Sequence, residues 1–449
     1  MIYDAIVLGR GPLGVYTSLK LVNRDFKVLN IDCGTGLKNL KKKKNVNSNV
    51  LWKTQQQAPS LNESASDSRW HGGCMNLPLS ELGEGYLKIP ISEKSFIQST
   101  ENVKNFFNIK DFDFINNKPI TNKISEIKDY ENVKYTYLTK DLRFEEKIKF
   151  LEEKDSYTFL DTNEQISFKL IPGKSVIVKS IDNSDNIFEY KGKQIFLCLG
   201  AIENARLLLN NTETLSLNEK NIGKNLNDHL RFPIARVEFK NFEKFRDIFD
   251  KKRNKINENN LWPRYIVENE DLKSYGFFKD WRDSNVFIRK FKFQFLKKII
   301  PHNGTAVLYL FTEKLFSEGT NLNLSNRHEI IPDLKVNFNL DNFEVDQINK
   351  IVDKYIEQLN KQFGNQIKNV EKYEICLNEK FLKTVVSSNH PSGTTLTGID
   401  PSSSLVNNKL QLWQHPNIFI YGSGSLPRPY YIHPTFTSMV LADVSLNLI

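Results

Sequence analysis

The stretch Gly9-Arg10-Gly11-Pro12-Leu13-Gly14 decides the fold. It follows a short apolar run, Tyr3–Leu8, which predicts a buried parallel strand. Val15–Val22 then predicts a helix, and Phe26–Ile31 predicts a second strand that ends at Asp32. The order strand, glycines, helix, strand, acid is the context in which a GxGxxG pattern indicates a dinucleotide-binding unit.

Each glycine has a distinct expected role in such a unit. Gly9 would make the tight turn, Gly11 would let the backbone approach a pyrophosphate, and Gly14 would let helix and strand pack closely. Asp32 follows Gly14 at close to the roughly 20 residues expected for an acid that binds a ribose hydroxyl. The pattern alone does not separate NAD from FAD.

Length and composition limit the other possibilities. The 449 residues predict two or three domains, and 39% hydrophobic residues are enough for a real core. The net charge of +9 is spread along the chain apart from Lys41–Lys44, a run typical of a solvated loop. Since no basic stripe with interleaved aromatics is present, nucleic acid is not an expected partner.

Cysteine usage and the first residues predict a cytoplasmic enzyme. The four cysteines lie far apart with no CxxC and no Cys/His spacing typical of metal sites, so we expect reduced thiols and no metal. The first predicted strand begins almost at Met1, which leaves no room for a signal peptide, and no apolar run reaches membrane-spanning length.

Further glycine-containing segments predict that the first sheet continues later in the chain. Val176–Lys179 and Phe188–Lys191 predict a hairpin, and Gln194–Leu199 predicts a strand that runs into Gly200 and a helix. Arg69–Asn76 carries the glycine pair Gly72-Gly73, which suits close backbone approach to something flat or anionic. Taken alone, that segment would be interpreted as a plain turn.

The closing stretch, Ser388–Ala442, is interpreted as the wall of an active site. Two His-Pro pairs, His390-Pro391 and His433-Pro434, bracket an apolar strand at Ile418–Tyr421 and the turn Gly422–Ser425. A helix is predicted from Thr435. Histidine is the side chain best suited to moving protons near neutral pH.

Together these segments resemble the glucose–methanol–choline (GMC) family of flavin oxidoreductases. The resemblance is carried by five blocks: Val7–Gly14 with Val28–Gly34, Arg69–Asn76, Gln194–Leu209, Asn221–His229 and Asn389–Met439. It implies an α/β fold in which a Rossmann-like FAD-binding domain is interleaved with an α+β substrate domain built on an antiparallel sheet. The expected FAD-binding parts are 1–84, 171–235 and 386–449, and the expected substrate-domain parts are 85–170 and 236–385.

The resemblance also implies residue roles. His390 would be the catalytic base and His433 the second active-site residue. The implied FAD-binding residues are Gly9, Gly11, Pro12, Leu13, Gly14, Asp32, Arg69, Gly72, Gly73, Asn76, Val178, Gly200, Ser423, Gly424, Pro434 and Thr435. The chain departs from the family at Ser423, where Asp is common. Met75, Asn76 and Leu77 stand where some members attach FAD to a histidine, so non-covalent FAD is expected.

The expected reaction is oxidation of an alcohol, with a sugar or polyol as the preferred substrate class. The flavin N5 would take the hydride and a histidine the hydroxyl proton. The alternatives are a hydroxynitrile-lyase-type enzyme on the same scaffold, a non-catalytic flavin sensor or assembly subunit, and a nicotinamide enzyme. The electron acceptor, whether oxygen, a quinone or a redox protein, is left open. His302, His328 and His415 are interpreted as structural, and His229 as a structural feature of the family that could also line the site.

Overall fold

The computed structural model describes residues 1–32, 45–51, 72–83, 91–120, 133–139, 144–161, 169–181, 187–241, 261–268, 272–280, 304–315, 319–325 and 332–449. Arg69, His71 and the lysine run Lys41–Lys44 lie outside these ranges, as do most of Lys38–Glu63 and Lys240–Lys298. None of the described helices is both long and apolar enough to cross a membrane.

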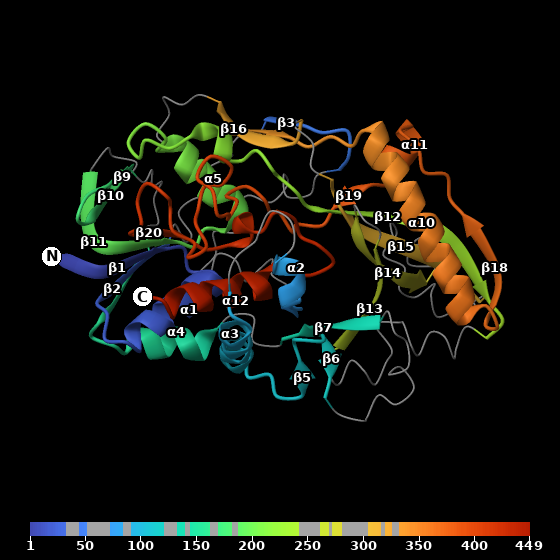
Figure 1. Cartoon of the computed structure of the whole chain (residues 1–449), viewed down its shortest axis with the longest axis horizontal. Coiled ribbons are helices and arrows are strands. Elements are labelled where there is room, and N and C mark those ends of the chain that lie inside the picture. Colours follow the sequence, from blue (N-terminus) through green and yellow to red (C-terminus); the bar gives the residue numbers. More distant parts are fainter. Residues whose placement is uncertain are drawn as a thin grey trace.

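Two large sheets lie side by side and divide the molecule (Figure 1). The first has the order β8-β2-β1-β11-β10-β9, with β20 also paired to β11. Its strands are β1 (Ile2–Leu8), β2 (Val28–Asp32), β8 (Tyr157–Asp161), β9 (Lys169–Ile171), β10 (Val176–Ile181), β11 (Ile187–Leu197) and β20 (Ile418–Ile420). β1 runs parallel to both β2 and β11, as the glycine unit predicts. Val178 pairs with Tyr190 across the predicted hairpin.

The strands at the centre of the first sheet are buried on both faces, which explains their continuous apolar sequence. In Figure 1, α1 (Pro12–Val22), α3 (Glu93–Phe106), α4 (Glu145–Glu152) and α12 (Pro434–Leu446) lie on one side of this sheet, and α5 (Gly200–Asn210) lies on the other. Asp443 of α12 accepts a hydrogen bond from Tyr16 of α1 (2.7 Å) and one from Asn102 of α3 (2.7 Å). The last helix therefore joins the two ends of the chain.

The second sheet is antiparallel, with the order β18-β12-β15-β14-β13-β7-β4 and β19 beside β12. Its strands are β4 (Gly73–Cys74), β7 (Val133–Leu138), β12 (His229–Phe239), β13 (Leu261–Glu268), β14 (Lys273–Asp280), β15 (Thr305–Glu313), β18 (Ile367–Lys372) and β19 (Val386–Ser387). The fold class predicted from the sequence is confirmed. The five-part domain division stays a prediction. Within 85–170, which was expected to belong to the substrate domain, β8 and part of β9 pair in the first sheet and β7 pairs in the second.

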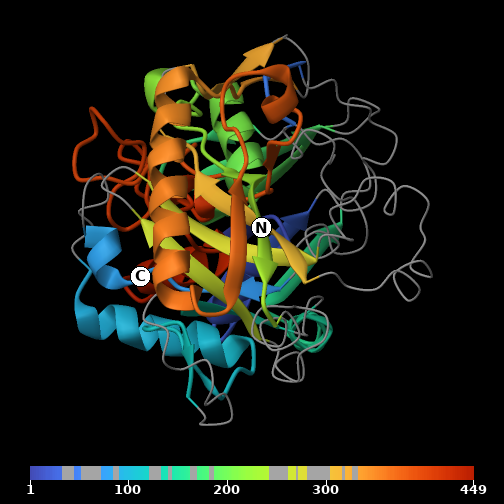
Figure 2. The same ribbon diagram turned by 90° about the vertical axis from the view of Figure 1, so that its right-hand side faces the viewer.

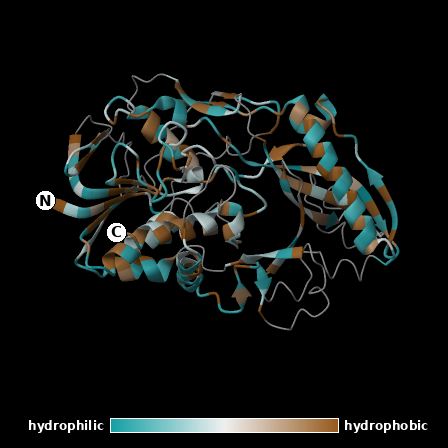
Figure 3. Ribbon diagram, in the orientation of Figure 1, coloured by the Kyte–Doolittle hydropathy of each residue, from teal (hydrophilic) through white to brown (hydrophobic). Residues whose placement is uncertain are grey.

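Helix α10 (Asn342–Phe363) covers the outer face of the second sheet (Figure 2). Asp341 and Glu344 form a capping box at its start, and its buried residues recur with helical spacing. Figure 3 shows hydrophilic and hydrophobic residues side by side along α10, as expected for a helix with one buried face. Tyr355 lies so close to β14 that a Cβ on Gly276 would come within 1.9 Å of its hydroxyl oxygen. The opposite face of the sheet therefore turns toward the first sheet.

The remaining elements are short. A three-stranded sheet and a two-stranded sheet contain β3 (Asn45–Asn47), β16 (Asn321–Ser325), β17 (Asp333–Asn337), β5 (Phe112–Asp113) and β6 (Lys118–Pro119). The short helices are α2 (Leu79–Gly83) and α11 (Glu379–Leu382), with 3₁₀ turns η5 (Glu219–Asn221) and η7 (Ser423–Ser425).

Candidate active site

The glycine loop closes tightly at the carboxyl end of β1. Gly9 has φ +103°, a conformation that favours glycine. A Cβ on Gly14 would come within 2.0 Å of the Gly9 carbonyl oxygen, so α1 lies directly against the loop. The carboxylate of Asp32 accepts the backbone N–H of Arg10 at 2.7 Å. The Asn30 side chain donates to the carbonyls of Val7 and Gly9 at 3.0 and 2.9 Å, which fixes the strand end.

The start of α1 can receive an anion. Gly11 is its N-cap residue, Pro12 occupies the first turn, and no side chain from the described residues caps it. Helix N-termini of this kind present backbone N–H groups and a partial positive charge, which suit a pyrophosphate. With Asp32 beside the same loop, the residues present fit the pyrophosphate and ribose of a dinucleotide.

The same edge continues across the sheet to β11 and β20. The Asn204 side chain donates to two backbone carbonyls. One is that of Leu197, the last residue of β11 (3.2 Å), and the other is that of Tyr421, the residue after β20 (3.1 Å). Gly200 (φ +81°) and Gly422 (φ +151°) follow these two strands, and a Cβ on Gly422 would lie 3.6 Å from the Gly200 Cα. Two positive-φ glycines therefore meet at the carboxyl edge where open α/β sheets bind ligands.

Some predicted cofactor residues have contacts inside the protein. Asn76 bonds to Thr100 and Thr437 through its side chain, so it links the segment after β4 to α3 and α12. The Ser423 hydroxyl donates to the Pro391 carbonyl at 2.7 Å, inside the turn that follows His390. Val178 lies in β10, two strands away from β1. Whether these residues contact a cofactor stays a prediction.

The turn that carries His390 is held by the Asn227–His229 segment. The Asp228 carboxylate is fully buried and accepts the backbone N–H groups of His229 (2.7 Å) and His390 (2.8 Å). Gly393 (φ +77°) could not carry a side chain, because its Cβ would come within 2.0 Å of the Asn225 carbonyl oxygen. The backbone of the predicted base is therefore anchored to a segment more than 150 residues away in the sequence.

Three histidines and an arginine form one hydrogen-bonded chain. His229 Nε2 lies 2.6 Å from the Tyr430 carbonyl oxygen, and His229 Nδ1 lies 2.8 Å from His390 Nδ1. His390 Nε2 lies 3.1 Å from His433 Nδ1, and His433 Nε2 lies 3.0 Å from an Arg264 guanidinium nitrogen.

For neutral rings this chain has one consistent set of tautomers. A carbonyl can only accept, so His229 carries its hydrogen on Nε2 and accepts at Nδ1. His390 then carries its hydrogen on Nδ1 and accepts at Nε2. His433 donates from Nδ1 to that lone pair, and its own Nε2 accepts from Arg264, which can only donate. The lone pair of His390 therefore faces the N–H of His433.

Burial supports this arrangement. Desolvation lowers the pKa of His229 from 6.5 to about 4, so the ring is neutral near pH 7. Its ring lies edge-on to Tyr275 and Phe311, at 5.6 and 6.4 Å between centroids. Tyr430 has φ +52°, an uncommon backbone conformation that helps to aim its carbonyl at His229. A neutral His229 can act as the acceptor that sets the tautomer of His390.

Arg264 is the most unusual residue of the site. It is fully buried, and its guanidinium lies 3.2 Å from the Trp262 ring centroid and 4.4 Å from that of Tyr275. Desolvation lowers its pKa to about 10, which leaves it a cation at neutral pH. Each cation–π contact stabilises by roughly 0.5–2 kcal/mol, whereas burying an unpaired ion costs several kcal/mol. No ion pair joins it to a carboxylate in the described part of the chain.

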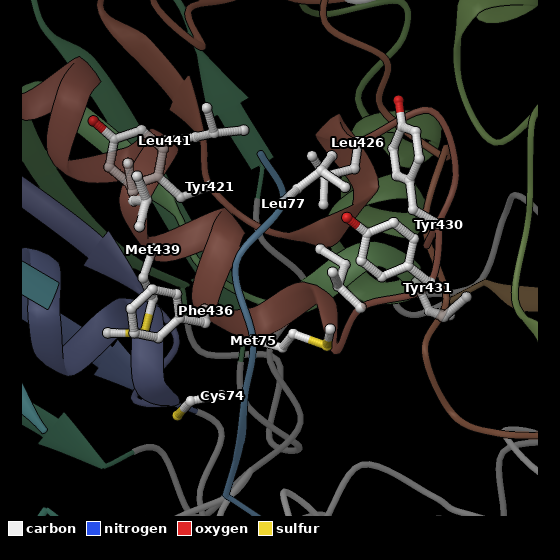
Figure 4. Close-up of a cluster of buried hydrophobic side chains, with 14 of the residues drawn as sticks. Cys74, Met75, Leu77, Tyr421, Leu426, Tyr430, Tyr431, Phe436, Met439 and Leu441 are labelled. Carbon is white, nitrogen blue, oxygen red and sulfur yellow. The ribbon is translucent and has the colours of Figure 1, made fainter. Parts of the chain in front are cut away.

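His433 is confined from the other side by the glycine pair. A Cβ on Gly73 would lie 3.0–3.1 Å from the Cγ and Nδ1 atoms of His433, so a side chain there would push the ring out of line. Figure 4 shows the apolar cluster around this point, in which the Cys74–Leu77 segment runs across α12. The cluster contains Leu426, Tyr430, Tyr431, Phe436 and Met439.

The structure thus brings His390, His433 and Gly73 together, places His229, which the sequence allowed to line the site, beside His390, and adds Arg264 and Tyr275, which the sequence did not single out. Register puts His229, Arg264 and Tyr275 on one face of the second sheet, from β12, β13 and β14. The spacing of Trp262-x-Arg264 and of Tyr275-x-Phe277 could have indicated that each pair lies on one face of a strand, because alternate residues of a strand share a face.

Comparison with known proteins agrees with this geometry. A family model described as GMC oxidoreductase matches residues 317–442. The gluconate 2-dehydrogenase flavoprotein of Pantoea cypripedii is 40% identical over 55 residues, which make up 12% of this chain and 9% of that protein.

Two solved structures have a similar fold over nearly the whole chain. Pyridoxine 4-oxidase from Mesorbium loti has a TM-score of 0.59 at 12% identity and covers 98% of each chain. A formate oxidase variant from Aspergillus oryzae has a TM-score of 0.56 at 12% identity, with 99% of this chain and 97% of that chain covered. The family resemblance predicted from the sequence is confirmed over residues 317–442, which the GMC oxidoreductase model matches, and the two solved structures share the fold over nearly the whole chain.

Proposed function

We propose that this protein is an FAD-dependent oxidoreductase that oxidises a CH–OH group, with His390 as the base. The observation that carries the proposal is the donor–acceptor pair formed by His433 Nδ1 and His390 Nε2, 3.1 Å apart. A hydroxyl group is one donor and one acceptor. It can therefore enter between the two rings, donate to His390 and accept from His433.

The cofactor assignment rests on the cradle at the first sheet and on the flavoprotein relatives. Gly9, Gly11 and the start of α1 would hold the pyrophosphate of FAD, and Asp32 a ribose hydroxyl. Gly72, Gly73, Gly424 and Thr435 would lie on the flavin side. When bound there, the flavin supplies the acceptor for the hydride that leaves the alcohol carbon.

The protein's own residues handle the proton and the oxygen. His390 takes the hydroxyl proton at Nε2, since its Nδ1–H is bonded to His229. His433 donates its Nδ1–H to the substrate oxygen and keeps it oriented as the carbonyl forms. Asp228 holds the His390 backbone in place. A positioned base of this kind contributes roughly 10²–10⁴ in rate.

The test is anaerobic flavin reduction by a panel of alcohols, sugars and polyols. The purified protein should show a flavin absorption spectrum, and an accepted alcohol should bleach it. His390→Ala should retain FAD and lose roughly two or more orders of magnitude in the reduction rate. His433→Ala should lose less, because its role is to position the oxygen.

His415→Ala provides the matched control, since this ring bonds a backbone carbonyl, that of Leu215, outside the histidine chain. It should reduce its flavin at the wild-type rate. A His390→Ala protein that does the same would rule out the assignment of the base. Flavin that no alcohol bleaches, in a protein that cleaves hydroxynitriles, would show a lyase on the same scaffold.

A further inference from the structure

We propose that the substrate is a hydroxy acid, and that Arg264 and Tyr275 bind its carboxylate while His390 and His433 engage the hydroxyl. This inference rests on the proposed function, because it names the substrate class of the same site. It starts from two buried donors that the described part of the chain leaves unpaired.

Both donors are enclosed by protein. Arg264 and Tyr275 are fully buried, yet Arg264 Nη1 and the Tyr275 hydroxyl have no hydrogen-bond partner in the described part of the chain. Buried polar groups are nearly always bonded, and a buried cation ordinarily has a counter-ion. The missing partner must supply hydrogen-bond acceptors and a negative charge, which is what a carboxylate supplies.

The two donors belong to the active site and not to a distant part of the core. Arg264 Nη2 donates to His433 Nε2 at 3.0 Å, and the Tyr275 ring lies 6.5 Å from the His433 ring between centroids. A single imidazole ring, that of His433, lies between Arg264 and His390. A molecule with its hydroxyl at His390 would therefore meet Arg264 one imidazole ring away, where a carboxylate of the same molecule could reach it.

The charge and shape of the pair favour a carboxylate. The site offers one guanidinium and one neutral hydroxyl, because burial raises the pKa of Tyr275 to about 12. This matches a monoanion, and a guanidinium forms planar hydrogen bonds suited to a carboxylate. Trp262 and Tyr275 cover the guanidinium and Phe311 stacks on Tyr275 at 4.7 Å, so water is a poor competitor there.

The reaction balances with this substrate. The hydroxyl O–H bond breaks and its proton goes to His390 Nε2. The C–H bond at the same carbon breaks, and its hydride goes to the flavin of the proposed function. A C=O bond forms, the carboxylate stays unchanged on Arg264, and the product is an oxo acid.

The experiment compares hydroxy acids with neutral alcohols of the same carbon skeleton. The probes are glycolate, lactate, glycerate and gluconate, set against ethylene glycol, propane-1,2-diol, glycerol and sorbitol. Binding to the oxidised holoprotein is measured by calorimetry, and flavin reduction is measured separately without oxygen. At least one acid should bind on the order of 100-fold more tightly than its matched alcohol, because its carboxylate forms charge-assisted hydrogen bonds.

Two variants test the assignment of the two donors. Arg264→Met should remove the preference for the acid, and Tyr275→Phe should weaken acid binding by roughly 10-fold. Because Arg264 also donates to His433, the readout for both variants is the ratio of acid affinity to alcohol affinity in the same protein. Tyr275→Phe removes one oxygen and keeps the stacked ring, so it remains informative even if Arg264→Met does not fold.

The controls are Arg236→Met and Tyr135→Phe. Arg236 is a partly exposed arginine of β12 whose guanidinium lies 3.7 Å from Glu238. Tyr135 is a second buried tyrosine with an unbonded hydroxyl, and it lies opposite Pro263, on the other face of the sheet from Arg264. Both controls should bind the acid as the wild type does.

Two results would overturn the inference. One is that no acid binds more tightly than its alcohol. The other is that Arg264→Met slows flavin reduction by acids and alcohols alike while its affinity for the acid stays unchanged. That result would mean that the Arg264 guanidinium interacts with the flavin and not with the substrate. Flavin reduction by neutral alcohols with no carboxylate binding would sink the inference and leave the proposed function intact. Carboxylate binding that depends on Arg264, together with a flavin that no alcohol reduces, would leave the carboxylate site intact and rule out the proposed function.

Discussion

Replacing His229 by phenylalanine tests whether the histidine chain sets the tautomer of the base. Phenylalanine keeps a flat ring against Tyr275 and Phe311 but has no acceptor for the Nδ1–H of His390. A buried donor that loses its partner costs about 1–3 kcal/mol. That penalty favours the other tautomer of His390, in which Nε2 carries the hydrogen and cannot accept the hydroxyl proton.

The expected loss follows from this penalty. Because 1.4 kcal/mol corresponds to tenfold, the population of the reactive tautomer should fall by roughly 5- to 150-fold. The assay is the rate of anaerobic flavin reduction at saturating alcohol, with flavin content and circular dichroism measured alongside. His229→Phe should retain its flavin and reduce it tens of times more slowly.

A second variant separates the tautomer from a loss of packing. His229→Gln supplies an amide oxygen that can accept from His390, so it should recover part of the rate. His415→Phe, which removes a ring-to-carbonyl hydrogen bond elsewhere, should have no effect. If His229→Phe works at the wild-type rate, or if His229→Gln and His229→Phe lose the same amount, the reasoning about tautomers is wrong.

Four further predictions concern the cofactor, pH and packing. FAD should be released into the supernatant by acid precipitation; flavin that stays with the protein pellet would mean a covalent bond. Gly11→Val places a side chain where the pyrophosphate must approach, so it should yield apoprotein, and full flavin content would contradict the site. The pKa of His229 falls from 6.5 in the unfolded chain to about 4 in the folded chain, so between these two values only the unfolded chain is protonated at this residue. The free energy of unfolding should therefore fall by about 3 kcal/mol between pH 7 and pH 4. Urea midpoints measured over this range should fall less in His229→Phe. Gly276→Ala should cost about 1–3 kcal/mol because its Cβ would overlap Tyr355, and a double variant with Tyr355→Leu should recover part of that loss in the same urea assay.

Much of the first sheet could be predicted because its signals are local. A buried parallel strand is a continuous apolar run. The loop after β1 needs glycine at Gly9 for its φ of +103° and at Gly14 because a Cβ there would meet the Gly9 carbonyl oxygen, and both reasons act within a few residues. The buried residues of α10 likewise recur with helical spacing, a pattern that lies within one element. His390 and His433 could be singled out because each stands in a short segment typical of the GMC family.

The segment 85–170 shows where local signals end. It contains no motif, yet the structure uses β8 to extend the first sheet beside β2, with Tyr157 opposite Val28. Such a pairing joins residues more than 100 positions apart, and no local pattern encodes which edge a short strand will find.

The sequence by itself indicated a resemblance to one family, the glycine loop after β1 and two histidines to consider. The tertiary structure decided what those histidines can do. His229, Arg264 and Tyr275 come from three strands of the second sheet, and only their shared face brings them to His390 and His433. The tautomer of His390 and the surroundings of the Arg264 cation depend on hydrogen bonds across distant segments, and such bonds exist only once the sheets have come together.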